Sequence, residues 1–272
     1  MIRLIYHGKT IVSYVETMGQ YSRLLLEFPQ DVQPLFLAAK AGQYILVKCE
    51  GHLLWRPFSI NFVEGKRVYI FFQIKGAGTD WLSKRVIGDE VEIRGPLGQG
   101  FKVLLKEQAQ LPILVAGGIG LAPLYYLREQ LFSWRYNFER VALLIGAQKD
   151  CCLVSKEMLV SGATLATNDG SVGFCGTVIE TLLEALKGEE GEGFSKIIYA
   201  AGPALMLREV ARIAAEWKIP CQVLLEERIA CGSGACYGCV IKTINGYKRV
   251  CCDGPVFNAE EVDWNEYTEF AC

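Results

Sequence analysis

Four cysteines in the last part of the chain have the spacing of ligands for an iron–sulfur cluster. Cys231, Cys236 and Cys239 form the pattern C-x4-C-x2-C, and Cys251 follows on the C-terminal side. This is the plant-type arrangement for a [2Fe–2S] cluster, which four thiolates hold. The residues between the first three cysteines are mostly glycine, serine and alanine. Such small residues let the chain wrap a cluster tightly and let backbone N–H groups approach its sulfurs.

Two alternatives remain open from the residues alone. A structural zinc site usually has two C-x2-C pairs with a longer spacer, whereas one knuckle here is C-x4-C. Cys252 lies beside Cys251 and competes with it for the place of fourth ligand. We interpret the other cysteines as packed or incidental thiols; they are Cys49, Cys151, Cys152, Cys175, Cys221 and Cys272.

Two glycine-rich turns indicate a nucleotide site. Gly117–Pro123 follows an apolar run and opens a helical pattern, and Gly202–Met206 repeats this design later in the chain. Glycines let a phosphate or nicotinamide approach the backbone, and a helix N-terminus favours negative charge. Tight strand–helix turns without a ligand are the alternative, because no acidic residue ends the second strand. The candidate residues are Gly117, Gly118, Gly120, Pro123, Gly202, Pro203 and Met206.

A third candidate site lies in the segment Trp55–Ile60, which offers a cation, an aromatic ring and a hydroxyl. Arg56 can clamp a pyrophosphate, and Ser59 can hydrogen-bond the edge of a flavin ring. Gly78 and Thr79, just before a predicted helix, can hold the other side of the same pyrophosphate. A surface ion pair is the alternative role for Arg56.

Two kinds of scaffold are predicted around these residues. Up to about residue 103, short β-branched and aromatic segments between turns predict an antiparallel β-barrel. Its strands are expected at Arg23–Phe28, Tyr44–Cys49, Trp55–Asn61, Arg67–Ile74 and Glu90–Arg94, with one helix at about Asp80–Val86. Beyond Gly100, buried strand runs alternate with helical segments, which predicts a parallel, doubly wound α/β domain.

The predicted α/β domain alternates strands with helices. Strands are expected at Pro112–Ala116, Val141–Gly146, Ala163–Thr167, Lys196–Ala201 and Gln222–Leu225, and helices at Ala122–Phe132, Val178–Lys187 and Ala204–Trp217. From Glu226 the chain is predicted to be loop-like. The fold class is therefore a multidomain α+β protein, with a barrel at 1–103, an α/β domain at 104–225 and a Cys-rich domain at 226–272.

Composition narrows the class of protein. The chain has 272 residues, 51% hydrophobic and 21% charged, with a net charge of −2 and no basic block, which argues against nucleic acid. The most apolar stretch, Leu111–Tyr126, is too short and too interrupted for a membrane span. The N-terminal residues lack the apolar core of a signal peptide, so we expect a cytoplasmic protein. The two histidines, His7 and His52, are predicted to be neither metal ligands nor bases.

In their order along the chain, these motifs resemble the ferredoxin-NADP reductase superfamily. They are Arg56-Pro57-x-Ser59, Gly78-Thr79, Gly95-Pro96-Leu97-Gly98, Gly117-Gly118-x-Gly120-x-Ala122-Pro123 and Gly202-Pro203-x-x-Met206. The resemblance implies FAD in the barrel and a nicotinamide nucleotide in the α/β domain. It also implies that Pro57 and Phe58 join Arg56, Ser59, Gly78 and Thr79 as FAD contacts. Phe71, Phe72 and Gln73 are expected on the adenine or ribose side.

The Cys-rich tail resembles the electron-transfer subunits of type B dihydroorotate dehydrogenase. The resemblance rests on Glu227–Cys239 and on Val250-Cys251-Cys252-Asp253-Gly254-Pro255. It assigns Cys251 as the fourth ligand, with Cys252 at a variable position. It also implies a separate FMN-containing catalytic subunit, which would form a heterotetramer with this chain, and electron flow through [2Fe–2S] and FAD to NAD⁺. No catalytic residue for dihydroorotate is apparent in this chain.

Two other functions remain as alternatives. One is the flavin and iron–sulfur subunit of an NAD(P)H:ferredoxin oxidoreductase or of a sulfur-reducing hydrogenase. The other is a non-catalytic zinc-binding interaction module. For the nucleotide, Gln148-Lys149-Asp150 contains one cation and no arginine pair for a 2′-phosphate, which favours NAD.

Overall fold

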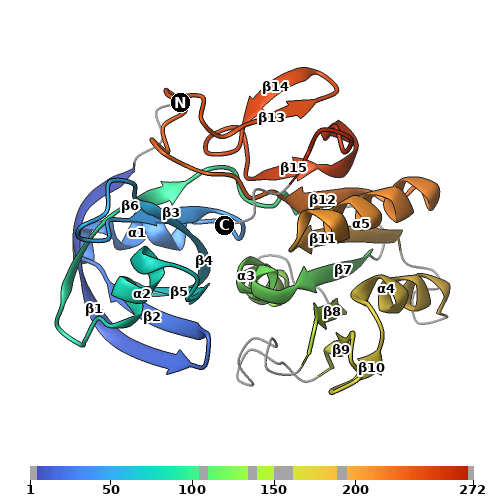
Figure 1. Ribbon diagram of the computed structural model, residues 1–272, viewed down its shortest axis with the longest axis horizontal. Helices are drawn as coiled ribbons and strands as arrows, with labels where there is room; N and C mark the ends of the chain where they lie inside the picture. Colours follow the sequence, from blue (N-terminus) through green and yellow to red (C-terminus); the bar gives the residue numbers. More distant parts are fainter. Residues whose placement is uncertain (1–4, 104–109, 134–139, 150–161, 189–194, 269–272) are drawn as a thin grey trace.

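The computed structural model describes residues 5–103, 110–133, 140–149, 162–188 and 195–268. In these ranges the chain forms a β-barrel, an α/β layer and a tail that lies over both (Figure 1). Among the incidental thiols predicted above, Cys151, Cys152 and Cys272 lie outside the described residues, as does Asp150.

The barrel is closed and antiparallel, in the strand order β1-β2-β5-β4-β3-β6. Its interior is filled by buried aliphatic side chains such as Leu24, Ile45 and Ile70. This confirms the barrel predicted from short strands and turns. The strands are β1 (Tyr6–Met18), β2 (Tyr21–Glu27), β3 (Tyr44–Val47), β4 (Arg56–Glu64), β5 (Arg67–Gln73) and β6 (Glu90–Leu97).

Two barrel features differ from the prediction. Strand β1 was not expected, because most of its side chains are polar or half-exposed and only Thr10 and Val12 are buried. Helix α2 (Ala77–Ser83) begins earlier than predicted, so Gly78 and Thr79 lie in its first turn rather than before it. A short helix, α1 (Gln33–Leu37), follows the 3₁₀ turn η1 (Gln30–Val32) and was also not predicted.

The α/β layer is built on a sheet in the order β10-β9-β8-β7-β11-β12-β15. Side chains of its central strand alternate between two cores: Leu114 faces α3 and the barrel, whereas Ile113 faces α4 and α5. Helices therefore cover both faces, as a doubly wound sheet requires. The strands are β7 (Gln110–Gly117), β8 (Ala142–Ala147), β9 (Thr164–Thr167), β10 (Phe174–Cys175), β11 (Ser195–Ala201) and β12 (Cys221–Leu224). The helices are α3 (Leu121–Phe132), α4 (Val178–Lys187) and α5 (Ala204–Glu216).

The tail is more ordered than predicted. It contains the hairpin β13 (Val240–Thr243) and β14 (Gly246–Arg249), then β15 (Val256–Asn258) and the 3₁₀ turn η6 (Ala259–Glu261). Strand β15 pairs antiparallel with β12, so the sheet is mixed rather than purely parallel. These strands are only three or four residues long, and β15 finds its partner in a different part of the chain. Local sequence pattern carries little information about such strands.

Helix α3 lies between the barrel and the sheet (Figure 1). Buried hydrogen bonds fix this junction: Asn61 Nδ2 donates to the Ala122 carbonyl at 3.0 Å, and the Tyr126 hydroxyl donates to the Ala39 carbonyl at 3.1 Å. A buried polar group is costly without its partner, so these bonds favour one orientation of α3 against the barrel. Over the described residues, we find no helix with the length and apolarity needed to cross a membrane.

Candidate cofactor site

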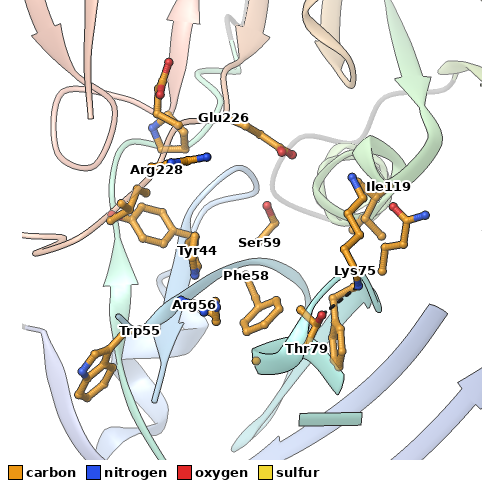
Figure 2. A pocket seen from close by; sticks show the side chains of 18 of the residues that line it. Tyr44, Trp55, Arg56, Phe58, Ser59, Lys75, Thr79, Ile119, Glu226 and Arg228 are labelled. Atoms are coloured by element: carbon orange, nitrogen blue, oxygen red, sulfur yellow. Dashed lines mark hydrogen bonds between the residues drawn. The ribbon is translucent and has the colours of Figure 1, made fainter. Parts of the chain in front are cut away.

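A pocket of about 590 Å³ lies where the barrel, the α/β layer and the tail meet (Figure 2). All barrel residues predicted to contact FAD line it: Arg56, Pro57, Phe58, Ser59, Phe71, Phe72, Gln73, Gly78 and Thr79. The α/β layer contributes Ile119, Ala122 and Pro123, and the tail contributes Glu226 to Ile229, Val250 and Pro255. The candidate flavin residues thus come together in one cavity.

Arg56 lies directly against the first turn of α2. Its guanidinium donates to the Leu54 carbonyl at 2.9 Å. A Cβ on Gly78 would lie 2.7 Å from Nε of Arg56, closer than real side chains approach. Gly78 is therefore required for the arginine to occupy this position at the pocket wall.

The hydroxyl of Thr79 makes hydrogen bonds within its own turn. It accepts hydrogen bonds from the backbone N–H groups of Lys75 at 3.0 Å and Gly76 at 3.1 Å, and it donates to the Gly76 carbonyl (Figure 2). The side chain thus shapes the Lys75–Thr79 turn. The contact of Gly78 and Thr79 with a pyrophosphate stays a prediction.

The pocket combines aromatic walls with charged groups. The rings of Phe58 and Phe72 are tilted against each other with centroids 5.0 Å apart. The lining includes three cationic residues, Arg56, Lys75 and Arg228. A flat apolar wall with several cations suits a flavin ring and a diphosphate. The donor set and shape therefore fit FAD.

Sequence reasoning missed the lining residues from the tail and from β3. Among them are Tyr44, Glu226 and Glu227, and burial raises the pKa of the Glu227 carboxyl. The backbone N–H of Glu226 is held by the Tyr267 hydroxyl at 3.2 Å. No local motif marks these residues: Tyr44 enters the pocket from strand β3, and Glu226 and Glu227 enter it because the tail passes over the barrel (Figure 1).

The two glycine turns lie next to each other at the ends of β7 and β11, which are neighbouring parallel strands. A Cβ on Gly117 would lie 2.7 Å from both Sδ of Met206 and Cδ of Pro203. A Cβ on Gly120 would lie 2.1 Å from the Ala201 carbonyl oxygen. Of the predicted nucleotide residues only Pro123 lines the pocket itself; the close packing of the turns places the others beside it.

The four candidate cluster ligands form two pairs. The thiol of Cys231 contacts Cys236; burial acts to raise its pKa, but hydrogen bonds from Ser233 and the Cys236 backbone lower it to about 5. The Cys251 backbone N–H donates to Sγ of Cys239 at 3.4 Å, and burial followed by this neighbour raises the pKa of the Cys251 thiol.

Pairing bears on the choice between iron–sulfur and zinc. A structural zinc ion needs all its ligands at one tetrahedral centre. A [2Fe–2S] cluster has two irons to share among four thiolates, so paired cysteines suit it better.

Cys252 occupies a different place from Cys251. Its sulfur lies against the cluster loop, where a Cβ on Gly234 would come within 2.7 Å of it, and its thiol also contacts that of Cys251. Arg249 holds this side of the loop by donating to the Gly234 carbonyl at 3.1 Å and by an ion pair with Asp253. Cys251 is only 1% exposed and adjoins Cys239. Cys251 as the fourth ligand stays a prediction.

The histidines have no part in this site. His7 contacts Glu92 at 2.9 Å on the outside of the barrel, and His52 is absent from the pocket lining.

Replacing Arg56 by alanine should weaken FAD retention. A charge-assisted hydrogen bond to phosphate contributes about 1.5–3 kcal/mol, equivalent to roughly a tenfold to hundredfold change in affinity. FAD occupancy after dilution and gel filtration measures the effect. Arg67→Ala is the control, since Arg67 pairs with Glu27 elsewhere on the barrel. Equal FAD retention in the two variants would remove Arg56 from the site.

A family model described as the iron–sulfur cluster binding domain of dihydroorotate dehydrogenase B matches residues 226–263. The dihydroorotate dehydrogenase B (NAD(+)) electron transfer subunit of Caldanaerobacter subterraneus subsp. tengcongensis is 38% identical over 81% of this chain and 86% of its own. The subunit of the same name from Desulforamulus reducens is 32% identical over 96% of this chain and 98% of its own.

Among solved structures, that of an NADH-dependent reduced ferredoxin-NADP oxidoreductase matches with a TM-score of 0.80 and 23% identity. The match covers 94% of this chain and 90% of the other. Barrel, α/β layer and shared pocket thus define a flavoprotein reductase fold with an iron–sulfur tail. Within that class, the chain belongs to the family of dihydroorotate dehydrogenase B (NAD⁺) electron transfer subunits.

Proposed function

We propose that this chain transfers electrons between an FMN-containing dihydroorotate dehydrogenase catalytic subunit and NAD⁺, in pyrimidine biosynthesis. The observation that carries the proposal is the shared pocket, because the barrel, the nucleotide turn and the Cys-rich tail all line it. Bound FAD would supply the conversion between two-electron hydride chemistry and one-electron transfer. The protein's contribution is to bind and orient the three redox partners.

Each part of the chain has a distinct task in this proposal. Residues 1–103 hold FAD, with Arg56 on its pyrophosphate and Phe58 and Ser59 at its ring. Residues 104–225 hold NAD(H) at the Gly117–Pro123 and Gly202–Met206 turns. Residues 226–272 hold the [2Fe–2S] cluster through the four paired cysteines. This division is supported by the lining of the pocket, to which all three parts contribute, and by the position of the two glycine turns at the ends of neighbouring strands.

An electron transfer subunit implies a catalytic subunit as its partner. We propose a heterotetramer with the FMN-containing subunit, in keeping with the family to which the chain belongs. We also propose a cytoplasmic location, since paired thiols available for iron are kept reduced there.

The isolated subunit should catalyse only the NADH half of the reaction. It should oxidise NADH with ferricyanide or a quinone, because the flavin pocket and the nucleotide turns lie within this chain. It should produce no NADH from dihydroorotate until the FMN-bearing partner is added. Absorbance at the NADH band, for the subunit alone and for the reconstituted pair, provides the measurement.

Two results would contradict this function. Dihydroorotate-dependent NADH production by the subunit alone would place a dihydroorotate site within this chain. If reduced ferredoxin can replace the FMN subunit as electron donor, the result would favour the ferredoxin oxidoreductase alternative. A colourless protein that contains zinc would indicate the interaction module.

A further inference from the structure

We infer that Tyr44 is a positioning residue that fixes the iron–sulfur loop against the flavin pocket, and that its hydroxyl is needed for fast electron transfer between the two. The inference rests on the proposed function, because it assumes a flavin in the pocket and a cluster at the paired cysteines. It concerns a residue that no motif in the sequence marks.

One end of Tyr44 belongs to the flavin pocket. The residue begins β3, pairs with Ser59 of β4, and lines the cavity (Figure 2). Its side chain is 3% exposed. Gly98, with a φ of +75°, leaves room for the ring, since a Cβ there would lie 3.0 Å from Cε1 of Tyr44. The ring is therefore held by its surroundings rather than free to rotate.

The other end of Tyr44 reaches the cluster loop. Its hydroxyl donates a buried hydrogen bond of 3.0 Å to the backbone carbonyl of Cys251, the proposed fourth ligand. Two residues along the same strand, Leu46 packs on the first turn of the cluster loop, where a Cβ on Gly232 would lie 2.5 Å from Cδ1 of Leu46. Strand β3 therefore holds the loop at two points.

This contact joins a side chain of the pocket wall directly to the backbone of the proposed fourth ligand. From the pocket wall it runs through one aromatic ring and one hydrogen bond to the backbone of Cys251. Small displacements of a functional group can reduce rates strongly even when binding is intact. If Cys251 loses this hydrogen bond, we therefore expect electron transfer between flavin and cluster to become slower while FAD and iron content stay the same.

Replacing Tyr44 by phenylalanine tests the role of the hydroxyl. The chain offers a matched control in Gln99, whose Nε2 donates at 3.0 Å to the carbonyl of the next residue, Cys252, yet is absent from the pocket lining. Gln99→Met removes an equivalent bond to the tail without altering the pocket. Both holoproteins are assayed for FAD and iron content, for the electron paramagnetic resonance spectrum after dithionite reduction, and by anaerobic stopped flow with NADH.

In the stopped-flow experiment NADH supplies two electrons as hydride to the bound flavin, and one of them passes on to reduce the cluster. We expect full FAD and iron content in both variants, and flavin bleaching in the same traces serves as the reference for cluster reduction. Cluster reduction should be several-fold slower in Tyr44→Phe alone, and its paramagnetic spectrum should show altered line shape, whereas Gln99→Met should match the parent protein.

The other outcomes overturn the inference. An unchanged rate of cluster reduction in Tyr44→Phe would show that the hydroxyl has no role in coupling. Equal slowing in Gln99→Met, or loss of FAD or iron from Tyr44→Phe, would indicate general support of the tail instead. Failure of NADH to bleach the flavin in the parent protein would count against the proposed function itself, and the inference would fall with it.

Discussion

Replacing any one of Cys231, Cys236, Cys239 and Cys251 by alanine should abolish the [2Fe–2S] signal in the electron paramagnetic resonance spectrum of the reduced protein. In the proposed site each paired thiol would supply one of the four ligands, so an alanine would leave one iron without its full set. Because the barrel pocket is built mainly by other residues, a Cys236→Ala protein should keep its FAD. It should also keep NADH oxidation with ferricyanide but lose coupled turnover with the catalytic subunit.

Cys252→Ala is the matched control for this series. Its sulfur lies against Gly234 and contacts the Cys251 thiol, whereas it is Cys251 that adjoins Cys239. The signal should survive in this variant with little change. A cluster that persists in Cys251→Ala and disappears in Cys252→Ala would show that the fourth ligand is misassigned. Full coupled turnover in the cluster-free Cys236→Ala protein would remove the cluster from the electron path.

Replacing Gly120 by alanine should strongly impair NADH oxidation and lower stability. The added Cβ would lie 2.1 Å from the Ala201 carbonyl oxygen and 2.4 Å from its carbon, so backbone must move. Overpacking of this kind costs about 1–3 kcal/mol. The shift falls between the two glycine turns, so the KM for NADH should rise while FAD content stays near that of the parent protein.

Gly188→Ala provides the control for Gly120→Ala. Gly188 follows helix α4 in the same layer, and a Cβ there would meet only the Glu184 carbonyl at 3.4 Å, an ordinary contact. Thermal unfolding and steady-state kinetics of both variants give the comparison. Unchanged KM and thermal midpoint in Gly120→Ala would mean that the two turns are not in the tight contact described here.

The elements that could be predicted are those whose own sequence carries a clear local signal. Helix α4 matches its predicted bounds because it has an apolar face and a capping box, in which Thr177 and Glu180 satisfy each other's backbone N–H groups. Strand β1 was missed because it lies at the barrel surface with few buried side chains. Strand β15 was missed because only its pairing with β12 makes it a strand.

The residues of the candidate site also fall into two groups, those that the sequence could predict and those that it could not. Residues in motifs, such as Arg56 and Cys231, could be proposed from the sequence because spacing limits their chemistry. Tyr44 and Glu226 could not, since they enter the pocket through contacts between segments far apart in the chain. Even within a motif, the pattern did not reveal that the Thr79 hydroxyl is occupied by its own turn.

The pairing of β15 with β12 has a consequence for attempts to shorten or exchange the Cys-rich tail. A chain cut after residue 225 would lose more than its iron, because β12 would become an uncovered edge with free N–H and C=O groups. Exposed edges of this kind recruit strands from other molecules and promote aggregation. A graft of the tail onto a related reductase would likewise need a host sheet with a vacant edge. The nucleotide layer and the Cys-rich tail therefore share one sheet, and each depends on the other to complete it.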